Sequence, residues 1–329
     1  MQSEMRSIVV SRYGGPDVLE WKAVPVLPLG ASEIRIRTIA AAVNHTDLEV
    51  RAGNWPIRKP DPFPYVPGVE VVGEVVETGG LVARALIGQK VITMMQGLGG
   101  VRADRPGGYA EFVTVEANAA AQLPVGTDPV VMAAIGLAGV TAHEGLRPLG
   151  PLKGRQVMVT GAAGGVGSAA VSLATALGAH VLAIVSRPEQ ADYVRSLGAG
   201  RVLASKAGEL SLVEPESVDG VFDTVGAAVF ETSLSALKPG ATLSLVGAVG
   251  GSDVRFDLWN LIRPVSLTGY SSESLDGTAL EVAVATLARL AAKRAMQTPK
   301  WTTMPLSDAS RAHAALEQGG IKGRILLVP

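Results

Sequence analysis

The chain has 329 residues, no cysteine and a formal net charge of −1. This charge balance leaves no basic field for nucleic acid or anionic lipid, and the lack of cysteine excludes disulfides and thiolate metal sites. Hydrophobic residues make up 47% of the chain against 18% charged residues, which is typical of a well-buried globular protein and argues against disorder. The length favours two domains.

The amino-terminal segment Met1–Gly15 mixes charged residues with its apolar ones and lacks the hydrophobic stretch of a signal peptide. The longest apolar run, Val130–Val140, is far shorter than the roughly 20 residues of a membrane-spanning helix. We therefore expect a cytoplasmic protein with no membrane span and no nucleic-acid partner.

From Ile8 to about Pro124 the sequence has β character, because short β-branched runs are separated by turns rich in proline and glycine. This pattern predicts a compact domain that is mostly antiparallel or barrel-like. The predicted strands are Glu33–Ala40, Val69–Glu77, Lys90–Met94 and Ala110–Val115.

After a predicted helix, Asp128–Leu146, strand-like and helix-like segments alternate. Alternation predicts a parallel sheet with helices on both faces, since parallel strands require crossover connections. A break at Pro239-Gly240 is expected before the strand Thr242–Val246. The other alternating segments are Gln156–Thr160, Val166–Leu177, Val181–Val185, Pro188–Leu197, Val218–Phe222 and Ala228–Leu237, and the tail is predicted as helices Leu275–Lys293 and Asp308–Gln318 and strand Arg324–Val328.

The stretch Val157–Val185 contains an apolar run, a glycine-rich turn, an alanine-rich segment and a second apolar run, which predicts a βαβ unit. Ala162, Gly164 and Gly167 occupy the three positions of the G-x-G-x-x-G fingerprint, with alanine at the first. Glycine suits this turn because a pyrophosphate reaches the N–H groups of a helix N-terminus only where no Cβ blocks it. We predict dinucleotide binding; the alternative is a tight turn without a ligand.

The end of the second strand of this unit indicates which dinucleotide binds. An acidic residue there favours NAD, whereas a small residue and a cation favour the 2′-phosphate of NADP. Ser186 and Arg187 follow Val185, and Glu189 falls in the first turn of the next helix. The sequence therefore predicts NADPH, with a solvated loop arginine as the alternative for Arg187.

Several motifs along the whole chain resemble one known family. They are YGGPDVLE at Tyr13–Glu20, VNHTD at Val43–Asp47, VPGVEVVGEV at Val66–Val75, GGYAEF at Gly107–Phe112, GVTAH at Gly139–His143, FDTVG at Phe222–Gly226 and the terminal KGRILLVP. The chain resembles the medium-chain dehydrogenase/reductase superfamily and, within it, the zinc-free quinone oxidoreductase branch of zeta-crystallin-like proteins.

This resemblance implies an α/β fold with a GroES-like β-rich catalytic domain and a Rossmann domain with a doubly wound parallel sheet. The expected limits are residues 1–124 for the catalytic domain, 125–265 for the nucleotide-binding domain and 266–329 for a tail that returns to the catalytic domain. Related proteins pair through an edge strand of the nucleotide sheet, so the resemblance also implies a homodimer.

Zinc-dependent relatives carry a cysteine where this chain has Asn44, a histidine where it has Val69, and a four-cysteine lobe that cannot form here. His45 and His143 each lack a second histidine at ligand spacing. We therefore expect no metal, and a substrate carbonyl would be polarised by hydrogen bonds.

The activity implied is hydride transfer from NADPH to a quinone or an α,β-unsaturated carbonyl, whose conjugated oxygen accepts the developing charge without a strong Lewis acid. One alternative is a reductase of 2-enoyl thioesters or another carbonyl, for which Arg51, Arg58 and Lys59 would supply positive charge. Another alternative is an NADPH-binding protein with little catalysis.

The resemblance also indicates candidate catalytic residues. Asn44 is the first candidate for an amide donor to the substrate oxygen or the nicotinamide ribose, and Thr141 matches a threonine close to the nicotinamide. Asp47 either orients Asn44 or holds a helix start, and Trp55 either lines the substrate mouth or packs in the core. For Thr141 the alternative is a hydroxyl that bonds back to its own helix. No side chain stands out as a general acid.

The expected cofactor contacts lie at the ends of the predicted strands, where ligands of such folds bind. Besides Asn44 and Thr141, they are Gly164, Gly165, Val166, Ser186, Arg187, Val225, Gly247, Ala248, Val249 and, from the tail, Arg324.

Overall fold

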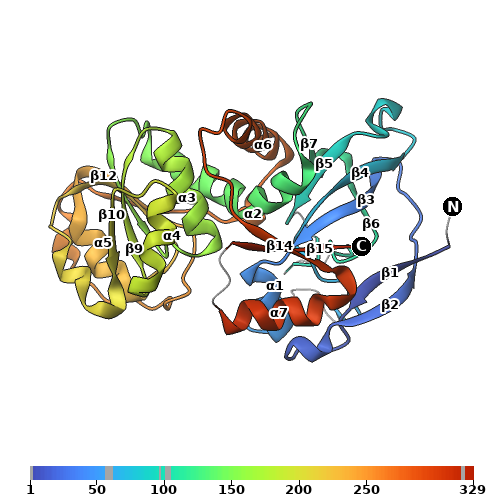
Figure 1. The fold of residues 1–329 in the computed structure, drawn as a ribbon, viewed down its shortest axis with the longest axis horizontal. Helices are drawn as coiled ribbons and strands as arrows, with labels where there is room; N and C mark the ends of the chain where they lie inside the picture. The colour runs from blue at the N-terminus through green and yellow to red at the C-terminus, as the bar shows by residue number, and fades with distance from the viewer. Residues whose placement is uncertain (1–2, 56–61, 96–97, 101–104, 320–322) are drawn as a thin grey trace. The chain divides into compact units, whose positions relative to one another are not determined.

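The computed structural model describes residues 3–55, 62–95, 98–100, 105–319 and 323–329. The chain divides into two compact units (Figure 1). Unit 1 comprises Met1–Leu137, Glu273–Ala288 and Pro299–Pro329, and unit 2 comprises Ala138–Ser272 and Arg289–Thr298.

Unit 1 is built on a seven-stranded sheet in which β3 (Glu33–Ala42) is paired on one side with β4 (Glu70–Thr78) and on the other with β6 (Phe112–Glu116) and β15 (Arg324–Val328). All three pairings are antiparallel, and those of β3 with β4 and β6 agree with the prediction for residues 8–124. The remaining strands are β5 (Lys90–Met94), β7 (Ala120–Gln122) and β14 (Trp301–Pro305), with a separate hairpin of β1 (Glu4–Val9) and β2 (Glu20–Pro25). Alternate β-branched residues of the strands form one core, which includes Ile34, Ile36, Val71, Val75, Val91, Val113 and Val115.

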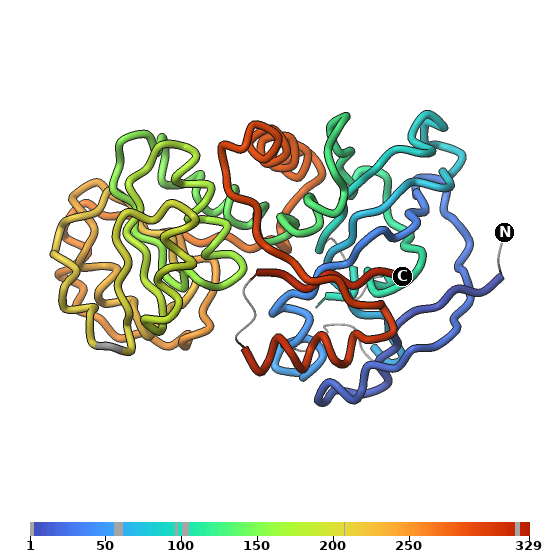
Figure 2. Tube along the Cα trace, viewed as in Figure 1, coloured from blue at the N-terminus to red at the C-terminus, as the bar shows by residue number. Residues whose placement is uncertain are grey.

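The carboxyl-terminal stretch belongs to unit 1 and lies beside the amino-terminal strands (Figure 2). Helix α7 (Ala309–Gln318) and strand β15 share a second core with helix α1 (His45–Ala52), in which Ala312, Leu327 and Leu48 are buried. Because β15 pairs with the end of β3, through Leu326 and Ala42, the start of β15 lies close to the loop that follows β3.

Unit 2 contains a six-stranded sheet in the order β10-β9-β8-β11-β12-β13, and all its pairings are parallel. This is the strand order 3-2-1-4-5-6 of dinucleotide-binding folds, and the direction of winding reverses between β8 and β11. The predicted α/β class with a doubly wound parallel sheet is confirmed. The strands are β8 (Gln156–Thr160), β9 (His180–Val185), β10 (Arg201–Ala204), β11 (Val218–Asp223), β12 (Leu237–Leu245) and β13 (Ser266–Gly269); the helices are α3 (Gly165–Ala176), α4 (Ala191–Ser196) and α5 (Phe230–Ala236).

Two further helices are α2 (Pro129–Leu146) and α6 (Gly277–Ala292). Helix α2 is interrupted at Gly136, where φ is 38° and ψ is −141°. A Cβ at Gly136 would lie 1.5 Å from the Glu70 carboxylate, so only glycine fits there. By length and composition the range Pro129–Leu149 could cross a membrane, but 78% of its apolar 18-residue stretch is buried inside the protein. Buried core helices have the same apolar composition.

The interruption expected at Pro239-Gly240 falls inside the bounds of β12. The strand partner of Val218 is Leu237 and that of Gly220 is Thr242, so the ladder between β11 and β12 shifts register over the residues between Leu237 and Thr242. Such an irregularity tolerates proline and glycine because it leaves backbone groups outside the ladder.

Candidate active site and cofactor site

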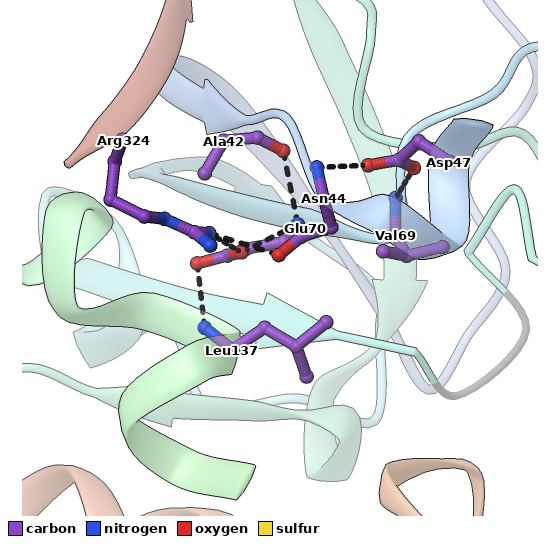
Figure 3. Close-up of polar contacts among 7 residues, drawn as sticks. All are labelled: Ala42, Asn44, Asp47, Val69, Glu70, Leu137 and Arg324. Carbon is purple, nitrogen blue, oxygen red and sulfur yellow. Dashed lines mark hydrogen bonds and ion pairs between the residues drawn. The ribbon is translucent and has the colours of Figure 1, made fainter. Parts of the chain in front are cut away.

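Asn44, Glu70 and Arg324 converge in unit 1 although they lie far apart in the sequence (Figure 3). Asn44 follows β3, Glu70 begins β4 and Arg324 begins β15, so the pairing of these strands brings the three side chains together. All three are buried, with exposed fractions of 7%, 0% and 7%.

Hydrogen bonds engage most polar atoms of this cluster. Arg324 donates from Nη2 to Asn44 Oδ1 at 2.9 Å and to Glu70 Oε2 at 3.2 Å. Asn44 Nδ2 donates to Glu70 Oε2 at 3.0 Å and to the carbonyl of Ala42 at 3.2 Å, and the Leu137 N–H donates to Glu70 Oε1 at 2.8 Å. Both amide hydrogens of Asn44 are therefore engaged, so it could donate to a substrate only by giving up one of these bonds.

Burial and the neighbouring groups act in opposite directions on the pKa of the Glu70 carboxyl. Burial raises the pKa of Glu70, whereas the Arg324 guanidinium, the Asn44 amide and the Leu137 N–H lower it. The Nε of Arg324 is buried without a hydrogen-bond partner among the described residues. A buried ion pair of this kind is stable only while both partners are present.

Asp47 lies in the first turn of α1 and ties this helix to β4. Its carboxylate accepts the N–H of Asn44 at 2.8 Å and that of Val69 at 3.0 Å. Burial is the main cause that raises the pKa of Asp47 to about 7, against the lowering effect of these N–H groups. Asp47 thus joins the start of α1 to the backbone of Asn44 and of Val69.

The donor set of this cluster does not suit zinc. Zinc sites of dehydrogenases use thiolates and imidazoles, whereas positions 44 and 69 hold an amide and an alkyl group, and the Glu70 carboxylate is already paired with a guanidinium. Among the described residues, no three His, Asp or Glu side chains gather as a metal site would require.

The other predicted residues of unit 1 are less engaged with this cluster. The Trp55 side chain is 39% exposed, and its backbone N–H bonds to the Glu49 carbonyl. Arg58 and Lys59, which were expected near a substrate mouth, lie outside the described residues. Arg51, expected there too, is only 2% exposed and paired inside unit 1, so that interpretation of Arg51 is wrong.

In unit 2 the glycine-rich turn after β8 leads directly into α3. Gly161 has φ of 59°, and Gly164 is the N-cap of α3 without a side-chain cap. Gly164 and Gly165 are exposed, so the first N–H groups of the helix, including that of Val166, are open to an anion. A Cβ at Gly167 would lie 2.2 Å from the Gly161 carbonyl oxygen, so the close approach of helix and turn requires glycine. This cradle fits the pyrophosphate of a dinucleotide.

A hydrogen-bond network joins this turn to the strand across the point where the winding reverses. Thr160 donates to Asp223 Oδ1 at 2.5 Å, and the Thr224 N–H donates to Thr160 Oγ1 at 3.0 Å. Asp223 also accepts the N–H groups of Val225 and Gly226. Asp223 and Thr160 were not among the predicted residues, although their places at the ends of β8 and β11 could have indicated them.

The loops after β11 and β12 contact each other at the same edge of the sheet. The Gly250 N–H donates to the Val225 carbonyl at 2.7 Å, and the Ala227 N–H donates to the Gly251 carbonyl at 2.9 Å. These bonds bring the loop that contains Val225 against the loop that contains Gly247, Ala248 and Val249. Thr141 lies on α2 within unit 2 and is 7% exposed.

Ser186 and Arg187 lie at the carboxyl end of β9, and both are exposed. The side chain of Gln190 accepts from the Ser186 hydroxyl at 2.9 Å and from the Arg187 N–H at 3.1 Å, which fixes this turn. The Lys206 N–H donates to the Ser186 carbonyl at 3.1 Å, so a second exposed cation lies beside the turn.

A hollow of about 640 Å³ lies at the opposite edge of the same sheet. It is lined at the strand starts by Gln156, His180, Arg201 and Val218. Ligands of doubly wound sheets bind at the carboxyl edge, so this hollow is at the wrong edge of the sheet for the cofactor.

Comparison with known proteins agrees with this architecture. Residues 30–125 match the family described as alcohol dehydrogenase GroES-like domain, and residues 165–286 match the family described as zinc-binding dehydrogenase. The chain is 30% identical to an alcohol dehydrogenase of Geobacillus stearothermophilus, with 98% of each chain covered. It is 35% identical to an acrylyl-CoA reductase of Ruegeria pomeroyi, over 75% of this chain and 74% of that one.

Two further similarities concern quinone reductases and NADPH. The chain is 29% identical to a quinone oxidoreductase of Pseudomonas aeruginosa, over 98% of this chain and 99% of that one. A mycobacterial protein solved in complex with NADPH is 32% identical, with a TM-score of 0.82 over 99% of this chain and 100% of that chain.

Proposed function

We propose that this chain, which belongs to the medium-chain dehydrogenase/reductase superfamily and to its quinone oxidoreductase-like branch, is a zinc-independent, NADPH-dependent reductase of quinones or α,β-unsaturated carbonyls. The observation that carries the proposal is the buried Glu70–Arg324 pair around Asn44, where zinc-dependent relatives bind their metal. Without a strong Lewis acid, the acceptor itself must delocalise the charge that hydride transfer creates.

A bound nicotinamide cofactor supplies the hydride. The chain's residues bind and orient it: the N–H groups at the start of α3 hold the pyrophosphate, and the loops after β11 and β12 flank the ribose and nicotinamide. Val225, Gly247, Ala248 and Val249 are the proposed contacts in these loops, and the Thr160–Asp223 bond keeps them in register with Gly161.

NADPH is proposed over NADH because Ser186, Arg187 and Lys206 supply a hydroxyl and two exposed cations at the ends of β9 and β10. A 2′-phosphate beside a guanidinium forms charge-assisted hydrogen bonds. The relative solved with NADPH supports the same choice.

The roles of the remaining residues are part of the proposal. Asn44 would donate to the substrate oxygen or the nicotinamide ribose by exchanging its bond to Ala42 or Glu70, and Arg324 would hold Asn44 Oδ1 during that exchange. Asp47 positions Asn44, Thr141 donates its hydroxyl near the nicotinamide, and Trp55 offers a half-exposed aromatic face to a planar acceptor.

A reductase of 2-enoyl thioesters is the second candidate, supported by similarity to the acrylyl-CoA reductase. The burial of Arg51 removes one of the cations expected to receive a coenzyme A ester. A third candidate, an NADPH-binding protein with little catalysis, shares the cofactor site and differs only in turnover.

The experiment that tests these candidates follows the absorbance of NADPH with a panel of quinones, enals, enones and enoyl thioesters. We expect turnover with quinones or enones that survives prolonged treatment with a zinc chelator. Preferential turnover of thioesters would favour the second candidate. Tight NADPH binding with no turnover of any acceptor would favour the third, and loss of activity on chelation would contradict the zinc-independent mechanism.

We also propose a cytoplasmic homodimer formed through the edge strand β13. All four residues of this strand are exposed, so its backbone edge is open to a second copy. Apolar side chains around it are largely exposed as well, with Leu258 at 71%, Trp259 at 73% and Ile262 at 68%. Exposed apolar side chains a few residues before an open edge strand suit a self-complementary twofold interface.

A further inference from the structure

Arg324 has hydrogen-bond donors that the cluster around Asn44 does not use. Both of its bonds come from Nη2, one to Asn44 Oδ1 at 2.9 Å and one to Glu70 Oε2 at 3.2 Å (Figure 3). Its Nε is buried and has no hydrogen-bond partner among the described residues, and Nη1 makes no bond to them either. Since all three nitrogens of a guanidinium carry N–H groups, Arg324 keeps donors for a further acceptor.

A buried charged donor without a partner is rare in folded proteins. The Arg324 side chain is 7% exposed, so little of it meets water, and the desolvation of an unpaired N–H is not offset by a bond. A catalytic role is one of the physical reasons for which such a group persists. The unused donors of Arg324 therefore point to an oxygen that is brought by a ligand.

The neighbouring residues hold the guanidinium in place before any ligand binds. Glu70, which is fully buried, balances its charge through Oε2, and the Leu137 N–H holds the other oxygen of Glu70 at 2.8 Å. The cation is thus fixed in surroundings of low dielectric constant, where it attracts a negative oxygen more strongly than it would in water. Donors that are fixed in advance in this way stabilise charge that develops in a transition state.

Asn44 alone does not supply such a donor. Its Nδ2 already donates to Glu70 and to the carbonyl of Ala42, so it gives up one of these bonds for each new one. Its amide is also neutral, whereas the oxygen of an acceptor that has received a hydride carries negative charge. Hydrogen bonds from an ionised donor to such an oxygen are roughly twice as strong as those between neutral groups.

We propose that Arg324 is a catalytic residue that donates a charge-assisted hydrogen bond to the oxygen of the acceptor, beside Asn44. The inference rests on the proposed function and names the group that stabilises the oxyanion there. The β-carbon of an enone gains the hydride, and with it two electrons, from the nicotinamide cofactor, which is oxidised. As this C–H bond forms, the Cα=Cβ π electrons move to the bond between Cα and the carbonyl carbon, and the C=O π electrons move to the oxygen. Arg324 stabilises that enolate oxygen, and a proton from water then gives the neutral ketone.

The first test measures the binding of an oxyanion without turnover. The probe is 4-nitrophenolate at mildly alkaline pH, a planar aromatic anion whose visible absorption reports its binding to the full chain. In Arg324→Met we expect its Kd to rise about 10- to 100-fold, because a charge-assisted donor is lost. The double variant Glu70→Gln/Arg324→Met should show the same loss in a protein that keeps no unpaired buried charge.

Glu70→Gln separates a direct role of Arg324 from a structural one by the sign of its effect. This variant keeps the guanidinium and removes the anion that competes for it, so we expect 4-nitrophenolate to bind about tenfold more tightly than in the wild type. A pair that served only the fold would weaken binding when either partner is replaced. Weaker binding in folded Glu70→Gln, or wild-type binding in the folded double variant, would overturn the proposal.

Two further measurements show which anion Arg324 serves. Arg311→Met removes an arginine of the same unit that is 76% exposed, and it should leave the Kd of 4-nitrophenolate unchanged. An equal loss in this control would overturn the proposal, since the probe would then respond to general positive charge. Fluorescence titration gives the Kd of NADPH in the double variant. A rise in that Kd with unchanged binding of 4-nitrophenolate would assign Arg324 to a phosphate of the cofactor and would also overturn the proposal.

The kinetic arm compares Glu70→Gln with Glu70→Gln/Arg324→Met, which differ only at position 324, over quinones of graded reduction potential at saturating NADPH. Loss of Arg324 should lower kcat most for the least reactive quinones, because these place more charge on their oxygen in the transition state. An equal loss across the series would indicate displaced residues and would overturn the catalytic role. If no acceptor turns over, the proposed function fails and the catalytic role with it, while the 4-nitrophenolate titration still decides whether Arg324 binds an oxyanion.

Discussion

The Arg324 guanidinium lies 3.2 Å from the Glu70 carboxylate, and the two side chains are 7% and 0% exposed. They lie 254 positions apart in the sequence and meet because β15 and β4 both pair with β3. This pair joins the carboxyl-terminal tail to the strand that begins the candidate active site, so the site is complete only when the tail has folded back.

We expect Arg324→Met to lower the free energy of unfolding by about 3–5 kcal/mol, because it leaves the Glu70 carboxylate buried without a cation. The double variant Glu70→Gln/Arg324→Met should cost clearly less than the sum of the single variants. Urea unfolding measures both. Arg311→Met is the control, since that side chain is 76% exposed and its surface pair with Asp308 is worth about 1 kcal/mol or less. Additive costs would show that the two side chains do not act as a pair.

The raised pKa of Asp47 predicts how stability depends on pH. Because the folded value is about 7 and the unfolded value is 3.8, the folded state binds the proton more tightly between these limits. Stability from this group is therefore greatest at low pH and falls as pH rises towards 7, by at most about 1.4 kcal/mol per pH unit. Urea unfolding of the wild type and of Asp47→Asn across this range measures the difference. Equal slopes in the two proteins would contradict the prediction.

The features that could be predicted from the sequence are local ones. The turn from Gly161 to Gly167 can be recognised from the sequence alone, because its conformation and the approach of a phosphate to it depend on glycines that are close together in the chain. The strands Lys90–Met94, Gln156–Thr160 and Arg324–Val328 were predicted at the bounds found in the structure.

What could not be predicted depends on partners distant in the sequence. The bonds of Asn44 to Glu70 and Arg324 span 26 and 280 positions, and no periodicity links those positions. The missed strand β13 is exposed along its whole length, so it has no buried alternation to reveal it. The Tyr109 hydroxyl lies 3.0 Å from His313 Nε2, a partner that only the folding of α7 against this part of the chain supplies.

The close approach of α3 to its preceding turn predicts a sharp effect of Gly167→Ala. A Cβ there would lie 2.2 Å from a backbone oxygen, which cannot move aside without shifting the turn. We expect a loss of about 1–3 kcal/mol in unfolding free energy and weaker NADPH binding by calorimetry. Gly200→Ala is the control, because its Cβ would meet its nearest atom at 3.9 Å. Wild-type NADPH affinity in folded Gly167→Ala would contradict the proposed phosphate cradle.

The exposed patch beside β13 predicts the oligomeric state. We expect the wild type to be a dimer by light scattering and Trp259→Glu/Ile262→Glu to be a monomer, because two carboxylates would be buried in the interface. Leu81→Glu is the control, since that residue is 83% exposed in unit 1, outside the patch. A monomeric wild type, or dissociation of the control as well, would contradict an interface at β13.

The pair Ser186 and Arg187 predicts the cofactor preference. In Ser186→Ala/Arg187→Ala we expect the Kd of NADPH to rise about 10- to 100-fold, since charge-assisted hydrogen bonds to the 2′-phosphate are lost. The Kd of NADH should change little, because NADH has no phosphate at that position. Fluorescence titration with both cofactors measures the two constants. Arg195→Ala on α4 is the matched control, because it removes an exposed arginine that pairs with Asp192 on its own helix. Equal losses for NADPH and NADH would mean that the turn supports the adenosine in general, and NADPH selectivity would then have to come from elsewhere.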